Sequence, residues 1–186
     1  MPTPDVYFTP EYHATSGLAE PDFSRSVLLE WTDHHGVVYL PLMLRHIRET
    51  DYFDAVSAYG YGGPWTQGDP DLSLFSEYLD QWASDNRVVS TFIRFHPLLE
   101  NAIGFQAVWP MKLIGPTAVW NIAQSSDLVQ GMAKNHRKNW RRAIRAGVHA
   151  RVTRSPDNID GFRDLYEETM ERLSARSSYW LNDEYW

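Results

Sequence analysis

The chain has 186 residues, with 17 basic side chains, 24 acidic side chains and a net charge of −7. It is 43% hydrophobic and 14% aromatic, a composition that is typical of a folded globular protein and excludes a disordered chain. It contains no cysteine, which excludes disulfides, thiolate nucleophiles and cysteine-based zinc sites.

The first half of the chain predicts a β-hairpin, a loop and a helix. Residues 25–31 and 36–47 are β-branched and apolar runs, and the turn-forming sequence Asp33-His34-His35-Gly36 lies between them. After a loop rich in glycine and proline, apolar residues at helical spacing predict an amphipathic helix over residues 71–85. The two adjacent histidines lie in a turn, where neighbours rarely converge on one metal, so we expect no metal site there.

The second half predicts short strands that alternate with two further helices. The helix that begins near Ser155 should bury an apolar stripe that includes Phe162 and Leu165. No internal repeat is present. These elements together predict an α+β fold around a mixed sheet. The remaining predicted strands cover residues 87–95, 105–109, 117–122 and 148–153, and the other helix covers residues 127–146.

The loop Tyr59-Gly60-Tyr61-Gly62-Gly63-Pro64 is the first candidate functional segment. Its glycines permit positive φ and let bare backbone approach a ligand closely, with N–H groups turned toward an anion or a carbonyl. The flanking tyrosines offer flat walls with a hydroxyl. The glycine spacing does not match a dinucleotide-binding fingerprint. A tight structural turn is the alternative interpretation.

Arg94 and His96 form the second candidate segment, because alternate side chains share one face of an extended chain. They lie at the end of a predicted strand, just before Pro97. A histidine there can serve as a general base near neutral pH. The alternative is structural: Arg94 pairs with a carboxylate and His96 caps a loop.

The third segment is a basic helix. Between residues 128 and 156 there are eight basic side chains and no acidic one. At about 100° per residue, six of the cations fall within an arc of about 140°, and Trp140 and Ile144 lie on the other side, which we expect to be buried. The cationic face predicts contact with phosphate or another anion, and a solvated charged face is the alternative. The six cations are Lys134, Arg137, Lys138, Arg141, Arg142 and Arg145.

Residues 52–64, 89–101 and 135–148, which contain these segments, resemble FemAB-like proteins of the GNAT superfamily. That family includes peptidoglycan-bridge aminoacyltransferases and BioF2-like acetyltransferase domains. The resemblance implies a GNAT-like N-terminal lobe over residues 1–116. It also implies the beginning of a second lobe over residues 117–186, and we expect the chain to stop before that lobe is complete.

The resemblance further implies transfer of an acyl or aminoacyl group from acyl-CoA or aminoacyl-tRNA to an amine or sugar acceptor, such as a nucleotide-linked sugar. No metal is expected. On this hypothesis His96 is the candidate base, and Lys134, Arg137, Arg141 and Arg142 bind phosphate. The acceptor site comprises Tyr59, Gly60, Tyr61, Gly62, Gly63, Arg94 and Asn101.

Two other hypotheses remain open. The chain is a non-catalytic module that holds an anionic partner, or, less favoured by its overall acidity, an RNA-binding protein. The sequence shows neither a signal-peptide pattern nor the roughly 18 apolar residues of a membrane span. We therefore expect a cytoplasmic protein.

Overall fold

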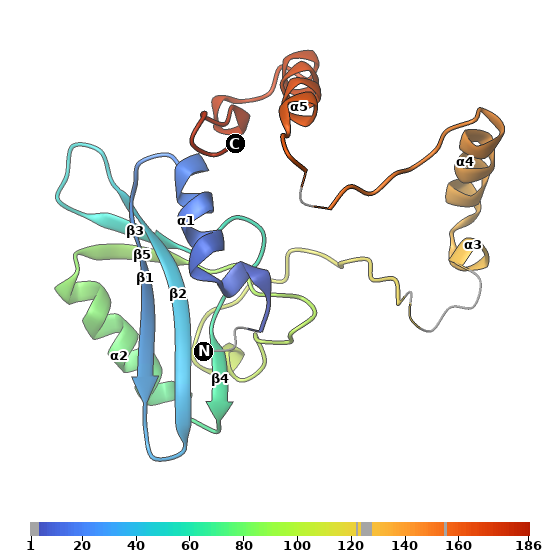
Figure 1. Ribbon diagram of the computed structural model, residues 1–186. Helices are drawn as coiled ribbons and strands as arrows, with labels where there is room; N and C mark the ends of the chain where they lie inside the picture. The colour runs from blue at the N-terminus through green and yellow to red at the C-terminus, as the bar shows by residue number, and fades with distance from the viewer. Residues whose placement is uncertain (1–3, 122, 124–127, 155) are drawn as a thin grey trace. The chain divides into compact units, whose positions relative to one another are not determined.

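The computed structural model describes residues 4–121, 123, 128–154 and 156–186, which fall into two compact units. One unit comprises Met1–Leu113 with Asp160–Trp186, and the other comprises Ile114–Ile159. The first holds the sheet, with α1 and α2 beside it (Figure 1). The helices are η1 (Val6–Phe8), α1 (Pro10–Ala19), α2 (Leu72–Asp85), η2 (Phe105–Ala107), α3 (Leu128–Gly131), α4 (Lys134–Arg145), α5 (Asp160–Arg172) and η4 (Ser177–Tyr179). The strands are β1 (Phe23–Thr32), β2 (Gly36–His46), β3 (Phe53–Val56), β4 (Trp65–Gly68) and β5 (Val88–Phe92).

The described residues form a mixed sheet of five strands, which confirms the predicted α+β class. The strand order is β1-β2-β3-β5, and β4 pairs with β2. All pairs are antiparallel except β3 with β5, which run parallel. Because parallel neighbours need a crossover connection, the chain passes through α2 between these two strands. Because β3 and β5 run parallel, their carboxyl ends lie side by side at one end of the sheet.

The predicted hairpin is present and its turn is held by one side chain. Asp33 Oδ1 accepts hydrogen bonds from the backbone N–H groups of His35 at 2.7 Å and Gly36 at 2.8 Å. Its other oxygen accepts from the N–H of Asp71 at 2.8 Å. Asp71 in turn caps α2 by accepting from the N–H of Ser73. These bonds connect the hairpin turn to the start of the helix, and the bond from Asp71 is the main reason that the pKa of Asp33 is lowered.

Strand β2 is the centre of the core, because both of its faces are covered. Leu40 and Leu42 belong to the larger cluster, in which Phe75 of α2 is fully buried. Met43, whose side chain points to the opposite face, lies in a second cluster against which Tyr12 of α1 packs. A strand buried on both faces requires a nearly continuous apolar run, which is why this segment is so apolar.

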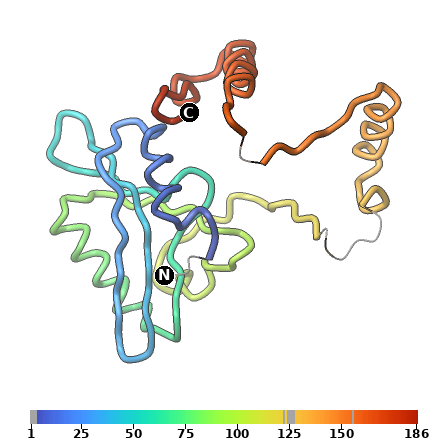
Figure 2. The backbone as a smooth tube through the Cα atoms, in the orientation of Figure 1, coloured from blue at the N-terminus to red at the C-terminus, as the bar shows by residue number. Residues whose placement is uncertain are grey.

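Several predicted elements differ in the structure. Residues 105–107 form a 3-10 helix rather than part of a strand. The rings of Phe105 and Trp109 lie 4.8 Å apart, and both lie near the ring of Phe75. Two side chains four positions apart can contact the same neighbour from a helical turn, whereas extended backbone would separate them. The predicted strands at 117–122 and 148–153 are also wrong for the described residues, which form no strand there. The backbone runs through both segments as extended connections (Figure 2). Residue 122 lies outside the described residues.

The last helix begins at Asp160 rather than near Ser155, which itself lies outside the described residues. Its apolar stripe was predicted to be buried, and this is wrong. Phe162 and Leu165 are each 61% exposed. The ring of Phe162 lies 5.9 Å from that of Trp186, so an aromatic contact replaces the expected core contact.

Candidate functional site

Two of the predicted segments meet at the carboxyl ends of β3 and β5. The parallel pairing continues beyond the strands, with Ser57 N–H donating to the carbonyl of Phe92 at 3.0 Å and Gly62 N–H donating to that of Arg94 at 2.8 Å. A single parallel bridge pairs Gly62 with Phe95. We call the resulting group the carboxyl-end cluster. Its members are Tyr59, Gly60, Tyr61, Gly62, Gly63, Arg94, His96 and Asn101.

The loop requires glycine because neighbouring side chains lie very close to its backbone. Gly60 has φ of 97° and Gly63 has φ of 93°, in the region that side chains disfavour. A Cβ at Gly60 would lie 2.5 Å from the ring of Tyr7. Gly62 and Gly63 are buried, whereas Tyr59 is 71% exposed. The loop is therefore anchored at its glycines and presents a tyrosine to solvent.

Asn101 fastens the loop to the segment that follows β5. Its Oδ1 accepts the backbone N–H of His96 at 2.9 Å. Its amide group donates to the carbonyls of Gly62 at 2.8 Å and Pro64 at 2.9 Å. Both ends of the side chain are thus committed to backbone partners, so Asn101 positions the cluster.

His96 is buried, and both ring nitrogens face protein groups. Nδ1 accepts the N–H of Leu98 at 3.2 Å, which leaves the proton of a neutral ring on Nε2. Nε2 lies 3.7 Å from a carboxylate oxygen of Asp5. The ring of Tyr61 lies 5.3 Å away, centroid to centroid. Base catalysis by His96 would first require Leu98 to leave Nδ1, so this geometry favours a positioning role.

Arg94 is exposed beside the loop and does not share the buried setting of His96. Its guanidinium lies 3.4 Å from the carbonyl oxygen of Gly60. In the described part of the chain no carboxylate pairs with it within 4.0 Å. A guanidinium held next to the loop but without a counter-charge can receive a carboxylate, phosphate or carbonyl oxygen of a ligand.

Two tyrosines near the N-terminus join the cluster, and no motif in the sequence predicts either of them. The ring of Tyr7 lies 5.7 Å from that of Tyr61 and 5.0 Å from that of Tyr12. The hydroxyl of Tyr12 donates to the carbonyl of Tyr59 at 2.7 Å, across 47 residues of sequence. Burial, and then the nearby Tyr7, raise the pKa of Tyr12. No local pattern signals such a long-range contact.

The basic helix belongs to the other unit and is broken near its start. Helices α3 and α4 replace the single helix predicted over residues 127–146, and residue 127 lies outside the described residues. Gly147 follows the second helix with φ of 74°, as expected of a residue that ends a helix. We call the six cations of α4 the basic face; they are Lys134, Arg137, Lys138, Arg141, Arg142 and Arg145.

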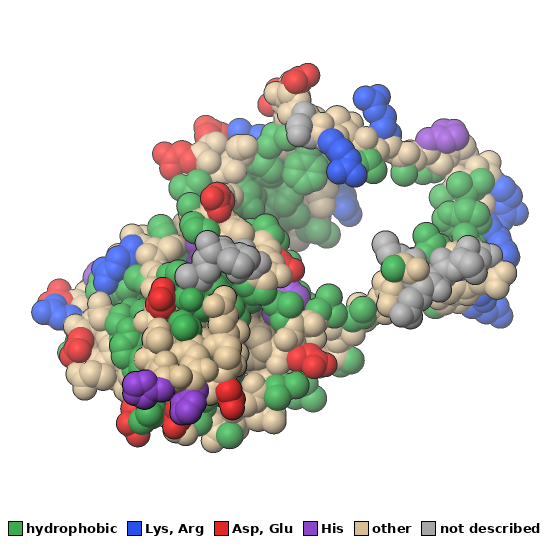
Figure 3. All heavy atoms as spheres, turned by 60° about the horizontal axis from the view of Figure 1, so that its bottom comes forward, with side chains coloured by type: hydrophobic (Ala, Val, Ile, Leu, Met, Phe, Trp, Pro, Cys, Tyr) green, Lys and Arg blue, Asp and Glu red, His purple; other side chains and the backbone are tan. Residues whose placement is uncertain are grey.

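The predicted burial of the apolar side of this helix is wrong. Trp140 is 41% exposed and Ile144 is 56% exposed, and neither belongs to a hydrophobic core cluster of the described residues. Within the described residues, the basic face forms no ion pair. Arg137 donates to the carbonyl of Gln130 at 2.9 Å. Figure 3 shows Lys and Arg side chains along one edge of this segment, with hydrophobic side chains beside them.

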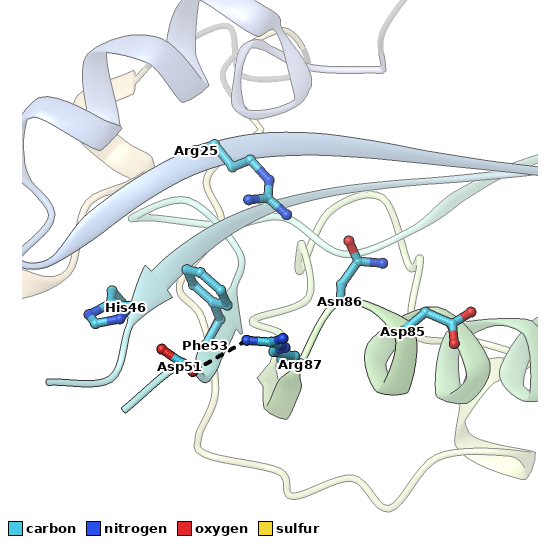
Figure 4. A pocket seen from close by; sticks show the side chains of 7 residues that line it. All are labelled: Arg25, His46, Asp51, Phe53, Asp85, Asn86 and Arg87. Atoms are coloured by element: carbon cyan, nitrogen blue, oxygen red, sulfur yellow. Dashed lines mark ion pairs between the residues drawn. The ribbon is translucent and has the colours of Figure 1, made fainter. Parts of the chain in front are cut away.

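A polar hollow lies at the opposite end of the sheet, where β3 and β5 begin (Figure 4). It measures about 370 Å³. The guanidinium of Arg25 lies 5.7 Å from the ring centroid of Phe53, and Arg87 pairs with Asp51 at 3.5 Å. Positive and negative groups are balanced here, so the hollow has no net preference for an anion.

Among the described residues, no group of three or more His, Asp or Glu side chains is placed to hold a metal ion. None of the helices in the described ranges has both the length and the apolar composition needed to cross a bilayer. Comparison with protein-family models, with characterised proteins and with solved structures found no match to this chain.

Proposed function

We propose that this chain is an acyltransferase of the FemAB-like GNAT type, with the carboxyl-end cluster as its acceptor site. One observation carries the proposal: the glycine-rich loop and Arg94 come together where two parallel strands end. In open α/β sheets, ligands bind in the crevice outside the carboxyl ends of the parallel strands. The mixed sheet flanked by helices agrees with the lobe that the sequence resemblance implies.

The chemistry requires an acceptor amine or hydroxyl to attack the carbonyl carbon of an acyl donor. A C–N or C–O bond forms, the bond from the carbonyl carbon to the thioester sulfur or ester oxygen breaks, and the acceptor proton passes through solvent water to the departing sulfur or oxygen. Arg94 and Tyr59 are the exposed members that orient the acceptor, a small molecule or nucleotide-linked sugar related to cell-wall or polysaccharide synthesis. Acyl-CoA or aminoacyl-tRNA is the donor, and its phosphates are assigned to Lys134, Arg137, Arg141 and Arg142 of the basic face.

Transfer of a radiolabelled acetyl group from acetyl-CoA to a panel of amines and sugar nucleotides tests this proposal. Arg94→Ala should weaken acceptor use at least tenfold without lowering the unfolding midpoint. Arg48→Ala is the matched control, since Arg48 is 78% exposed and pairs with Asp22 outside the cluster. An equal loss of acceptor use in both variants would contradict a specific role of Arg94 in binding the acceptor. A loss of acceptor use in Arg94→Ala together with a lower unfolding midpoint would indicate that Arg94 stabilises the fold instead.

A second candidate function is non-catalytic binding of an anionic partner. The observation in its favour is the basic face, which forms no ion pair within the described residues and is exposed at every member except the half-buried Arg137. It predicts salt-sensitive binding of an anion with no acyl transfer to any acceptor. Arg137→Glu combined with Arg141→Glu should abolish that binding and leave the unfolding of the sheet unchanged.

A further inference from the structure

Helix α4 has two different exposed surfaces side by side. The basic face covers an arc of about 140°, and Ala143, Trp140 and Ile144 follow one another around the remaining circumference. Trp140 and Ile144 stay 41% and 56% exposed. The helix is therefore amphipathic without a protein core to cover its apolar side in the described residues.

The neighbouring chain has the same character. Val148, just after α4, is 58% exposed, and Trp120 and Leu128 before it are 46% and 44% exposed. No acidic side chain occurs between residues 128 and 156, although the whole chain has a net charge of −7. Exposed apolar groups and uncompensated cations thus coincide in one segment of an otherwise acidic protein.

We propose that the basic face and the apolar side of α4 bind the surface of an anionic lipid bilayer. In this arrangement the helix lies in the plane of the interface. Trp140 and Ile144 enter the boundary between headgroups and acyl chains, and the arginines and lysines contact the lipid phosphates. A basic polar face with Trp and aliphatic side chains opposite, and low overall hydrophobicity, is the pattern of interfacial helices.

A bilayer fits these observations better than RNA does. Cations alone suffice for an RNA backbone, and an aliphatic side chain such as Ile144 gains little from a phosphate or from base stacking. Transfer of the same side chain from water into the hydrocarbon of a bilayer is favourable through the hydrophobic effect. The bilayer is the anionic partner of the second candidate function, on which this proposal rests. Bilayer binding requires no acyl transfer, so the result of the transfer assay with Arg94→Ala is independent of it.

The test is co-sedimentation of the full chain with vesicles of phosphatidylcholine, with and without phosphatidylglycerol. Binding should require the anionic lipid and weaken with added salt. Arg137→Glu with Arg141→Glu should weaken binding at least about a hundredfold, given the contribution of each cation near an anionic surface. Ile144→Ser, which leaves every charge in place, should weaken it about tenfold.

Ile103→Ser is the matched control, because Ile103 is a 65% exposed isoleucine of the other unit. It should bind vesicles like the unaltered chain. Failure of the unaltered chain to bind anionic vesicles would overturn the proposal, as would equal binding by Ile144→Ser, which would leave only charge attraction. Binding of single-stranded RNA that survives Ile144→Ser, with no vesicle binding, would assign the surface to RNA instead.

Discussion

Replacing Asn101 with alanine should loosen the carboxyl-end cluster more than any other single polar change in it. The substitution removes the hydrogen bonds to the N–H of His96 and to the carbonyls of Gly62 and Pro64. Gly62, Pro64 and His96 are buried, so the abandoned backbone groups are poorly placed to recover water. A group left without a partner costs about 1–3 kcal/mol, and the three losses are not fully additive; we expect a total of about 2–4 kcal/mol.

Urea unfolding followed by circular dichroism measures this loss. With a slope of about 2 kcal/mol per molar urea, the midpoint should fall by about 1–2 M. Amide hydrogen exchange should accelerate at His96 and Gly62 before it does in the centre of β2. Asn139→Ala is the matched control: Asn139 is exposed on α4, and its loss should change stability by less than about 0.5 kcal/mol. A midpoint that is the same for both variants would refute the reasoning.

Three further predictions concern packing, backbone conformation and pH. Phe75→Ala should destabilise the chain by about 3–5 kcal/mol in urea unfolding, because this fully buried ring touches both the sheet and η2; a loss below about 1 kcal/mol would contradict that role. Gly60→Ala should cost about 1–3 kcal/mol through its positive φ and the ring of Tyr7, whereas Gly115→Ala, where a Cβ meets nothing within 4 Å, should be nearly neutral; equal midpoints would disprove the close approach. Burial lowers the pKa of His13 below its ordinary 6.5, so the unfolded chain takes up its proton first and stability should fall as pH drops below about 6.5. In His13→Gln the urea unfolding midpoint should change less with pH between pH 7.5 and 5.5 than in the unaltered chain. A midpoint that falls as steeply in the variant as in the unaltered chain would contradict this prediction.

The first unit was largely predictable because its signals are local. Asp33 closes the hairpin through its own neighbouring N–H groups, and Asp71 caps the helix that the apolar spacing predicts. The density of glycine in the loop likewise predicted backbone that permits positive φ, and Gly60 and Gly63 adopt it. The contact of Tyr12 with Tyr59 could not be predicted, because it spans 47 residues and depends on how α1 lies against the sheet.

The second unit was predicted less well, because strand pairing and side-chain burial there depend on partners that lie far away in the sequence. A strand needs a neighbour with which to pair, and residues 148–153 have apolar alternation but no strand beside them in the described part of the chain. The periodicity of α4 correctly separated charges from apolar groups. It could not determine what covers Trp140, because burial depends on a partner that local spacing does not specify.

Chemical-shift mapping of the isotope-labelled chain, with acetyl-CoA and then with an accepted amine or sugar nucleotide, tests the assignment of the acceptor site most directly. The acceptor should shift the amide signals of Tyr59, Gly60, Gly63 and Arg94. These changes should disappear in Arg94→Ala and persist in Arg48→Ala. Acceptor-dependent shifts confined to the hollow around Arg25 and Arg87, with the carboxyl-end cluster unchanged, would contradict it.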